Sequence, residues 1–151
     1  MTNGSKPLGS DDKSGTEFVR EMLQGDPTFG INFDRIQWDS TKGRYVIVEL
    51  LFCDPQQFSR NITPYTSHPN RYFHMNSLKF ISLGELAAKI GSELILVNYT
   101  SKGTKYEDEV LVMNVEYIDE SKSPPVKTVD QKMTRVQFSN WFRDLNMRGK
   151  R

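Results

Sequence analysis

The chain has 151 residues, 36% of them hydrophobic, which suits one folded domain that buries a core without a metal or disulfide staple. Its single cysteine, Cys53, excludes an intramolecular disulfide framework. With 20 basic and 19 acidic residues the chain has no global attraction to nucleic acid, so any such binding must come from a local patch.

The N-terminus carries no apolar run, so the sequence predicts neither a signal peptide nor a membrane-spanning segment. We therefore expect a cytoplasmic protein that makes no contact with a membrane. We expect Cys53 to be a small buried apolar residue.

Three parts are expected along the chain. Residues 1–15 hold Gly, Ser, Asp and Lys with little to bury, which predicts a disordered leader. Residues 16–146 form a single α/β domain, and residues 147–151 form a short basic tail. The domain begins with a short helix from Thr16, in which Glu17 and Glu21 lie one turn apart.

Two strands joined by a tight turn are predicted next. Residues 31–39 carry large apolar groups on both faces, and residues 44–53 are almost continuously apolar and β-branched, as in a central strand. Asp34 lies on the first strand, and Glu49 is the only charge inside the second. In an antiparallel hairpin the two acids become near neighbours.

The rest of the chain predicts a helix from Pro69, a second helix that starts with a capping box at Ser82, two strands and a last helix. Residues 120–132 are expected to be a loop. The last helix starts at Thr134 and presents an apolar face for docking on the sheet. This order favours a three-layer-like α/β sandwich with a central mixed sheet flanked by helices.

Two neighbouring carboxylates repel each other unless a cation lies between them. Mg²⁺ prefers oxygen ligands from one or two carboxylates together with water and substrate phosphate, which Asp34 and Glu49 could offer. The alternative is structural: one acid bonds to a turn at the strand edge, and the other pairs with a nearby basic residue.

An acid on a first helix, an acid on a strand (FDRIQWD) and an acid in a buried strand (YVIVELL) resemble the PD-(D/E)XK nuclease superfamily. The resemblance covers roughly residues 16–100 and implies a restriction-endonuclease-like fold. It also implies that Asp34 and Glu49 bind Mg²⁺ or Mn²⁺ and that the protein hydrolyses DNA phosphodiester bonds.

The same resemblance implies further catalytic residues. Glu17 or Glu21 would orient the metal or its water. The family's lysine, expected two residues after the second acid, is Leu51 here, and Lys79 is the candidate substitute. An ordinary solvated lysine is the alternative for Lys79.

A second group of residues has the chemistry for contacts with phosphates and bases, namely Ser67, His68, Asn70, Arg71 and Tyr72. A loop that caps a helix start would explain Ser67 equally well. No zinc site is expected, because the histidines lack the spacing with cysteine that zinc sites show.

The leading functional hypothesis is a Mg²⁺-dependent DNA endonuclease of a mobile-element, phage-defence or repair system. The alternative is a DNA- or protein-binding module that keeps the nuclease fold without catalysis. A third hypothesis is a subunit of a larger complex or a homodimer, with the basic tail on nucleic acid.

Overall fold

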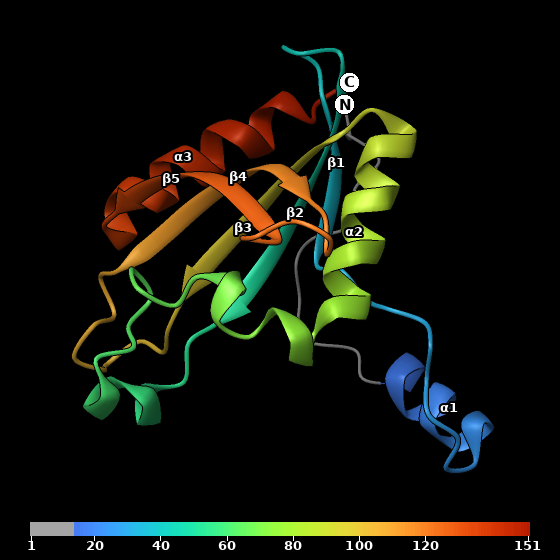
Figure 1. Ribbon diagram of the computed structural model, residues 1–151. Helices are drawn as coiled ribbons and strands as arrows, with labels where there is room; N and C mark the ends of the chain where they lie inside the picture. Colours follow the sequence, from blue (N-terminus) through green and yellow to red (C-terminus); the bar gives the residue numbers. More distant parts are fainter. Residues whose placement is uncertain (1–13) are drawn as a thin grey trace.

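Five strands form one mixed sheet in the computed structural model, which describes residues 14–151 (Figure 1). Of the leader expected over residues 1–15, residues 1–13 lie outside the described residues. The elements in chain order are α1 (Ser14–Leu23), β1 (Arg35–Asp39), β2 (Arg44–Phe52), the short 3₁₀ turns η1 (Pro55–Arg60), η2 (Pro69–Arg71) and η3 (Phe73–Met75), α2 (Ser77–Ile90), β3 (Glu93–Tyr99), β4 (Val110–Ile118), β5 (Val126–Met133) and α3 (Arg135–Arg148).

The strands lie side by side in the order in which they occur in the sequence. β2 and β3 are parallel, with Val46 opposite Glu93 and Phe52 opposite Tyr99, and α2 makes the crossover between them. All other neighbouring pairs are antiparallel. The expected α/β architecture with a mixed sheet is therefore confirmed.

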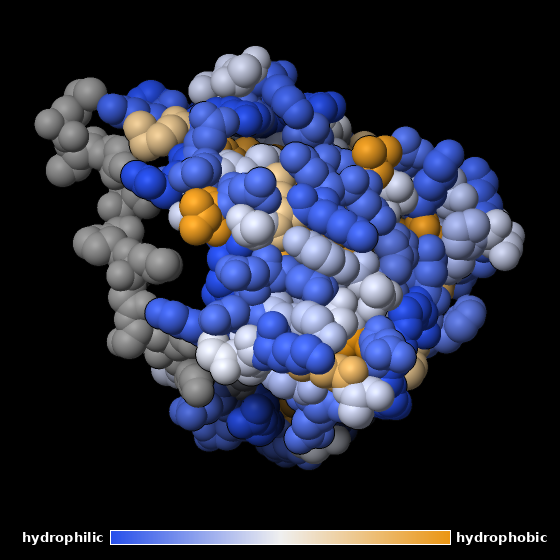
Figure 2. All heavy atoms as spheres, turned by 90° about the vertical axis from the view of Figure 1, so that its left-hand side faces the viewer, coloured by the Kyte–Doolittle hydropathy of each residue, from blue (hydrophilic) through white to orange (hydrophobic). Residues whose placement is uncertain are grey.

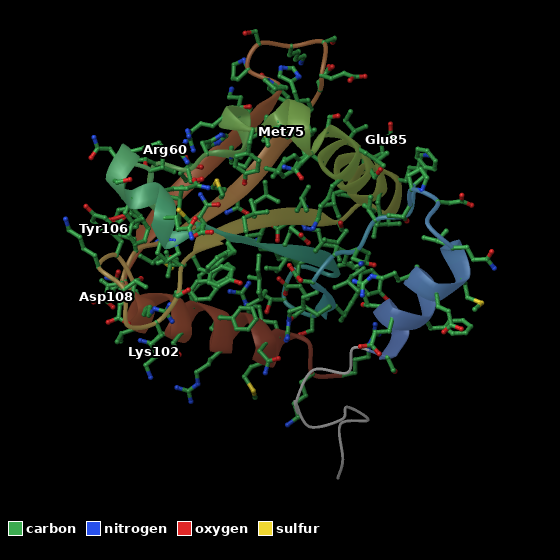
Figure 3. All side chains as sticks on the ribbon, turned by 90° about the horizontal axis from the view of Figure 1, so that it is seen from below. Arg60, Met75, Glu85, Lys102, Tyr106 and Asp108 are labelled. Carbon is green, nitrogen blue, oxygen red and sulfur yellow. The ribbon has the colours of Figure 1, made fainter. Side chains whose placement is uncertain are left out.

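Helices α2 and α3 cover opposite faces of the sheet, as the view in Figure 3 shows. Alternate residues of the central strands supply the two cores, because successive side chains of a strand point to opposite faces. Ile47, Leu96 and Met113 pack on the α2 side, and Val48, Val97 and Val112 pack on the α3 side. The central strands are apolar on both faces for this reason.

The β1–β2 hairpin is closed by Asp39, which is completely buried. Its Oδ1 accepts hydrogen bonds from the backbone N–H groups of Thr41 and Lys42, at 3.0 and 3.2 Å. Its Oδ2 lies 3.3 Å from Nη1 of Arg148 at the end of α3. The hairpin turn is thus tied to the last helix. The β1–β2 register pairs Arg35 with Val48, so Asp34 comes next to Glu49.

The prediction of a loop over residues 120–132 is wrong, because most of this segment belongs to β5. β5 lies at the edge of the sheet, and of its residues only Val126 and Met133, at the two ends, are buried. An edge strand with exposed polar residues lacks the apolar pattern that identifies a buried strand.

The helix expected from Pro69 is replaced by η2 and η3, and α2 begins at Ser77. Tyr72 and Asn76 have φ near −130°, outside the helical range, so each ends a 3₁₀ turn. Ser82 therefore lies inside α2 and does not start a helix. The capping box at Thr134 is confirmed, since its side chain accepts from the N–H of Gln137.

α1 lies apart from the sheet and buries none of its residues (Figure 1). Its apolar side chains Phe18, Val19 and Met22 are all more than half exposed. Among the described residues, no helix is long and apolar enough to cross a membrane.

Candidate functional site

Glu49 is the centre of the candidate site. It lies on β2 with its side chain on the face that α2 covers, because its neighbours Ile47 and Leu51 at alternate positions pack into the α2-side core. Only 1% of Glu49 is exposed. A carboxyl buried to this degree needs polar partners, and two of them come from other elements.

Asp34 is the first partner. It lies one residue before β1, is exposed, and is joined to Glu49 and Leu50 of β2 by hydrogen bonds. The backbone N–H of Asp34 donates to Glu49 Oε2 at 3.1 Å, and the N–H of Leu50 donates to Asp34 Oδ2 at 2.8 Å. The expectation that the two acids are near neighbours is confirmed.

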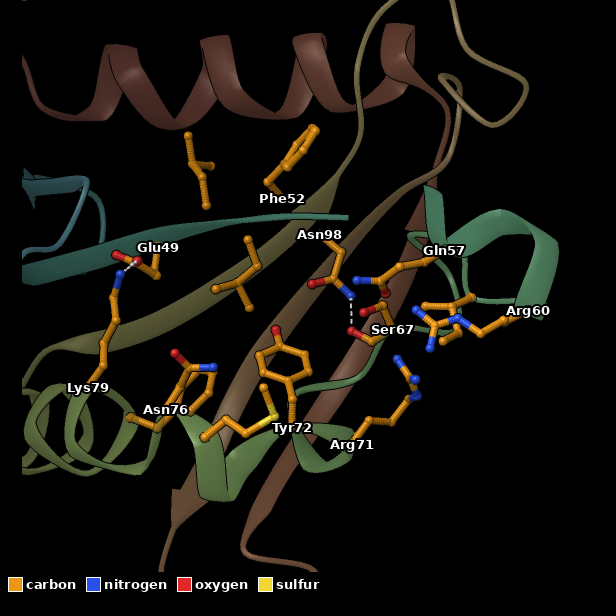
Figure 4. Close-up of a pocket in the computed structure, with 15 residues that line it drawn as sticks. Glu49, Phe52, Gln57, Arg60, Ser67, Arg71, Tyr72, Asn76, Lys79 and Asn98 are labelled. Atoms are coloured by element: carbon orange, nitrogen blue, oxygen red, sulfur yellow. Dashed lines mark hydrogen bonds and ion pairs between the residues drawn. The ribbon is translucent and has the colours of Figure 1, made fainter. Parts of the chain in front are cut away.

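Lys79 is the second partner. It lies in the first turn of α2, and its ammonium group forms an ion pair with Glu49 Oε1 (Figure 4). The Lys79 side chain is 35% exposed, whereas that of Glu49 is 2% exposed. Lys79 is therefore no ordinary solvated lysine, since its charge lies on the acid of the central strand.

Burial raises the pKa of Glu49 above its ordinary value. The hydrogen bond from Lys79 acts in the opposite direction and lowers the pKa, and the negative charge of Asp34 raises it again. Burial prevails, so Glu49 holds its proton more tightly than an exposed glutamate does.

Two carboxylates could hold a divalent ion here. Asp34 Oδ1 accepts no hydrogen bond from residues 14–151, and Glu49 Oε1 is bound only by Lys79. Within those residues no group of three or more His, Cys, Asp or Glu side chains is arranged for a metal. The pair has the two carboxylates that Mg²⁺ can take from a protein, and the Asp34 N–H and Lys79 already occupy the two Glu49 oxygens.

A cavity of about 500 Å³ opens beside Glu49 and Lys79, which both line it (Figure 4). It lies where the parallel strands β2 and β3 approach their carboxyl ends, which is where open α/β sheets bind ligands. The polar residues of its wall include Glu49, Lys79, Tyr72, Asn98, Arg60 and Arg71.

The residues predicted for nucleic-acid contacts divide into two groups. Ser67, Arg71 and Tyr72 line the cavity. His68 and Asn70 face β5 instead: His68 Nε2 lies 2.8 Å from Thr128 Oγ1, and the Asn70 amide donates to the carbonyl and accepts from the N–H of Val126. These two side chains hold the edge strand.

Tyr72 is half-buried, and burial raises its pKa to about 12. It therefore keeps its hydroxyl proton at neutral pH. Its ring packs against Phe80 of α2 with a centroid distance of 5.9 Å.

Glu17 and Glu21 lie on α1, where both are exposed. Neither side chain forms a hydrogen bond or an ion pair with another residue of the described chain. The structure thus brings Asp34, Glu49 and Lys79 together and leaves the two helical acids apart.

The sequence did not reveal Arg60 and Asn98 as residues of this site. Arg60 ends η1 in a segment without periodic pattern, so nothing in the sequence marks it. Asn98 is the one uncharged polar side chain in the interior of the apolar strand β3, which was a usable signal. Its amide donates to the carbonyls of Pro64 and Ser67, at 3.0 and 2.6 Å, and so anchors the cavity wall to the sheet.

The fold and the site together define an α/β protein with a five-stranded mixed sheet, flanking helices and an acid–acid–lysine group beside a basic cavity. Comparisons with models of protein families, with curated proteins and with solved structures gave no match to this chain. The chemistry of the site's own residues therefore carries the functional proposal.

Proposed function

We propose that the protein is a Mg²⁺- or Mn²⁺-dependent endonuclease that hydrolyses phosphodiester bonds in DNA. The observation that carries the proposal is that Asp34 and Lys79 both contact Glu49, and that Glu49 and Lys79 line a cavity whose other polar residues include two arginines. Carboxylates for a metal and cations for phosphates are the groups that this reaction needs.

The two acids have complementary roles. Glu49 is fixed in the sheet by the Asp34 N–H, so its carboxylate has one orientation before any ligand arrives. Asp34 is exposed and keeps Oδ1 available. A divalent ion held by this pair would activate a water molecule and stabilise negative charge on the phosphoryl oxygens.

Lys79 supplies a positive charge at the same place. Its ammonium group already lies on Glu49, on a helix packed against the sheet, so little reorganisation is needed to neutralise charge that develops on a phosphate. This supports the role expected of a substitute for the motif lysine, whose usual position is Leu51.

The element order supports a restriction-endonuclease-like fold of the PD-(D/E)XK type. Glu49 lies on β2, Asp34 lies directly before β1, and α2 leads from β2 to the parallel strand β3. We propose membership of this superfamily on that order and on the acids, with Lys79 in the place of the motif lysine.

Nicking of supercoiled plasmid in Mg²⁺ or Mn²⁺ tests the proposal. We expect Asp34→Asn and Glu49→Gln to abolish nicking, and Lys79→Ala to slow it about 10²- to 10³-fold, as the loss of one charge-stabilising donor does. Glu85→Gln is the matched control, since Glu85 is an exposed acid of α2 that does not line the cavity. A folded wild-type protein that cuts DNA with neither metal would overturn the enzyme proposal, and full activity of Lys79→Ala would overturn the role of the lysine.

A non-catalytic nucleic-acid-binding module is the second candidate. It is favoured by the Lys79–Glu49 ion pair, which neutralises the buried acid without a metal. This candidate predicts a salt-sensitive DNA complex in EDTA that survives the double change Asp34→Asn and Glu49→Gln, together with no cleavage in any metal.

A further inference from the structure

Arg60 and Arg71 line the same cavity from two different segments, the ends of η1 and η2. Figure 4 shows both side chains extending into the part of the cavity near Gln57 and Ser67, away from Lys79. Neither guanidinium group forms a hydrogen bond or an ion pair with any residue in 14–151. Two arginines thus share one cavity without an anionic partner.

Two like charges in one concave site repel each other, and the repulsion is relieved when an anion binds between them. Glu49 does not serve as that anion, because Lys79 already pairs with it. Guanidinium groups present fixed forks of N–H donors that match the oxygens of a phosphate. The chemistry of this end of the cavity is therefore that of a phosphate-binding site.

The space between the arginines and the Glu49–Lys79 pair suits a nucleobase. The Tyr72 ring lies between them in Figure 4, and the amides of Gln57 and Asn76 belong to the same wall. Aromatic rings stack on bases, and amides hydrogen-bond to base edges. A volume of about 500 Å³ is that of a small-ligand pocket, and it matches one nucleotide.

We propose that this cavity binds one unpaired nucleotide, with its phosphate on Arg60 and Arg71 and its base beside Tyr72. The preferred polymer is then a single strand or a duplex with an unpaired end. The inference rests on the proposed function for the identity of the polymer, and it adds the strandedness of the substrate and a second phosphate site.

Fluorescence anisotropy in EDTA tests the inference separately from catalysis. The probes are a labelled single-stranded oligonucleotide and a blunt hairpin duplex of related sequence, and the proteins are wild type, Arg60→Gln, Arg71→Gln and Arg143→Gln. Arg143 is the matched control, because it is an exposed arginine of α3 outside this cavity.

We expect the single strand to bind at least about tenfold more tightly than the blunt duplex. Each cavity variant should lose about tenfold in affinity for the single strand, the value of one charge-assisted contact, while Arg143→Gln loses less than about twofold. Arg71→Lys keeps the charge but lacks the fork, so it should also bind more weakly than wild type.

Equal binding of single strand and blunt duplex would overturn the inference, as would equal losses in Arg71→Gln and Arg143→Gln. Competition with a nucleoside 5′-monophosphate and with inorganic phosphate identifies the ligand: the monophosphate should compete better if the base is bound too, and equal competition would contradict the base site. Repeating the titration with Glu49→Gln separates the two proposals. Glu49→Gln should lose cleavage but keep single-strand binding, because the arginine site does not depend on the acid.

Discussion

Glu49 is held inside the sheet by one backbone N–H and one ammonium group, and burial still raises its pKa. A carboxylate in that position is kept charged only by its neighbours, so the fold loses free energy to keep it ionised. Groups with shifted pKa values are concentrated at functional sites, which is why we place the candidate site at Glu49.

The pH dependence of stability measures this cost. A folded pKa raised above the ordinary value of 4.5 means that the contribution of Glu49 to stability is fully present below that pH and is lost as pH rises through the folded pKa. The free energy of unfolding of wild type should therefore fall relative to that of Glu49→Gln as pH rises from the ordinary pKa of a glutamate through the raised folded pKa of Glu49.

Urea unfolding of wild type and of Glu49→Gln over this pH range measures the difference between their free energies of unfolding. Lys79 is partly exposed, so water can solvate its charge when the glutamate is replaced. A difference that stays constant with pH, or one that favours wild type increasingly as pH rises, would show that burial does not dominate the pKa of Glu49.

Among the elements, β5 depends most on side chains outside the sheet. Asn70 from η2 donates to the carbonyl of Val126 at 2.8 Å and accepts from its N–H at 2.9 Å, at the outer edge of the sheet. His68 adds a contact to Thr128. The 3₁₀ turns that form the cavity wall are thereby joined to the edge of the sheet.

Asn70→Ala should destabilise the protein by about 2 kcal/mol, because it leaves two polar groups of the buried Val126 unpaired. Denaturant unfolding measures the loss, and faster amide hydrogen exchange in β5 locates it. Asn140→Ala on the exposed side of α3 is the control and should change stability by less than about 0.5 kcal/mol. A loss of stability in Asn70→Ala no larger than in this control would mean that the two hydrogen bonds between Asn70 and Val126 do not hold β5.

At the scale of the whole molecule, charge is balanced, with a net value of +1. The face in Figure 2 is mainly hydrophilic, with apolar residues scattered singly, as is usual for a protein surface. Binding to nucleic acid must therefore depend on a few cations and not on a general field.

The salt dependence of single-strand binding counts these cations. If Arg60 and Arg71 contact one phosphate and Lys79 contacts a second, the slope of log affinity against log salt should be about −1.4. The double change Arg60→Gln and Arg71→Gln should reduce its magnitude by about 0.7, and Arg143→Gln should leave it unchanged. A much steeper slope, insensitive to the cavity arginines, would place the binding surface elsewhere.

The sequence predicted the parts of the fold that show regular apolar patterns. The buried strands β2, β3 and β4, the last helix with its capping box, and the proximity of Asp34 to Glu49 all follow from periodicity and hairpin geometry. β5 and the 3₁₀ turns were missed, because an exposed edge strand and short turns depend on tertiary contacts such as the hydrogen bonds between Asn70 and Val126.

The candidate site was predictable only where a polar residue interrupts an apolar pattern. Glu49 is such a residue, and Lys79 entered only as a substitute for an absent lysine. Arg60 comes from a segment without pattern, and its position in the cavity depends on how residues 54–76 cross the end of the sheet. Folding in three dimensions, not sequence spacing, creates that half of the site.

The central claim is that Asp34 and Glu49 are metal ligands, and calorimetric titration of Mn²⁺ tests it most directly. We predict one Mn²⁺ site in wild type, at least about tenfold weaker binding in Asp34→Asn and in Glu49→Gln, and unchanged binding in Glu85→Gln. Binding to wild type should also weaken as pH falls towards the raised pKa of Glu49, since the ion competes with the proton. No binding heat in the folded wild type, or equal affinity in wild type and both acid variants, would contradict the account.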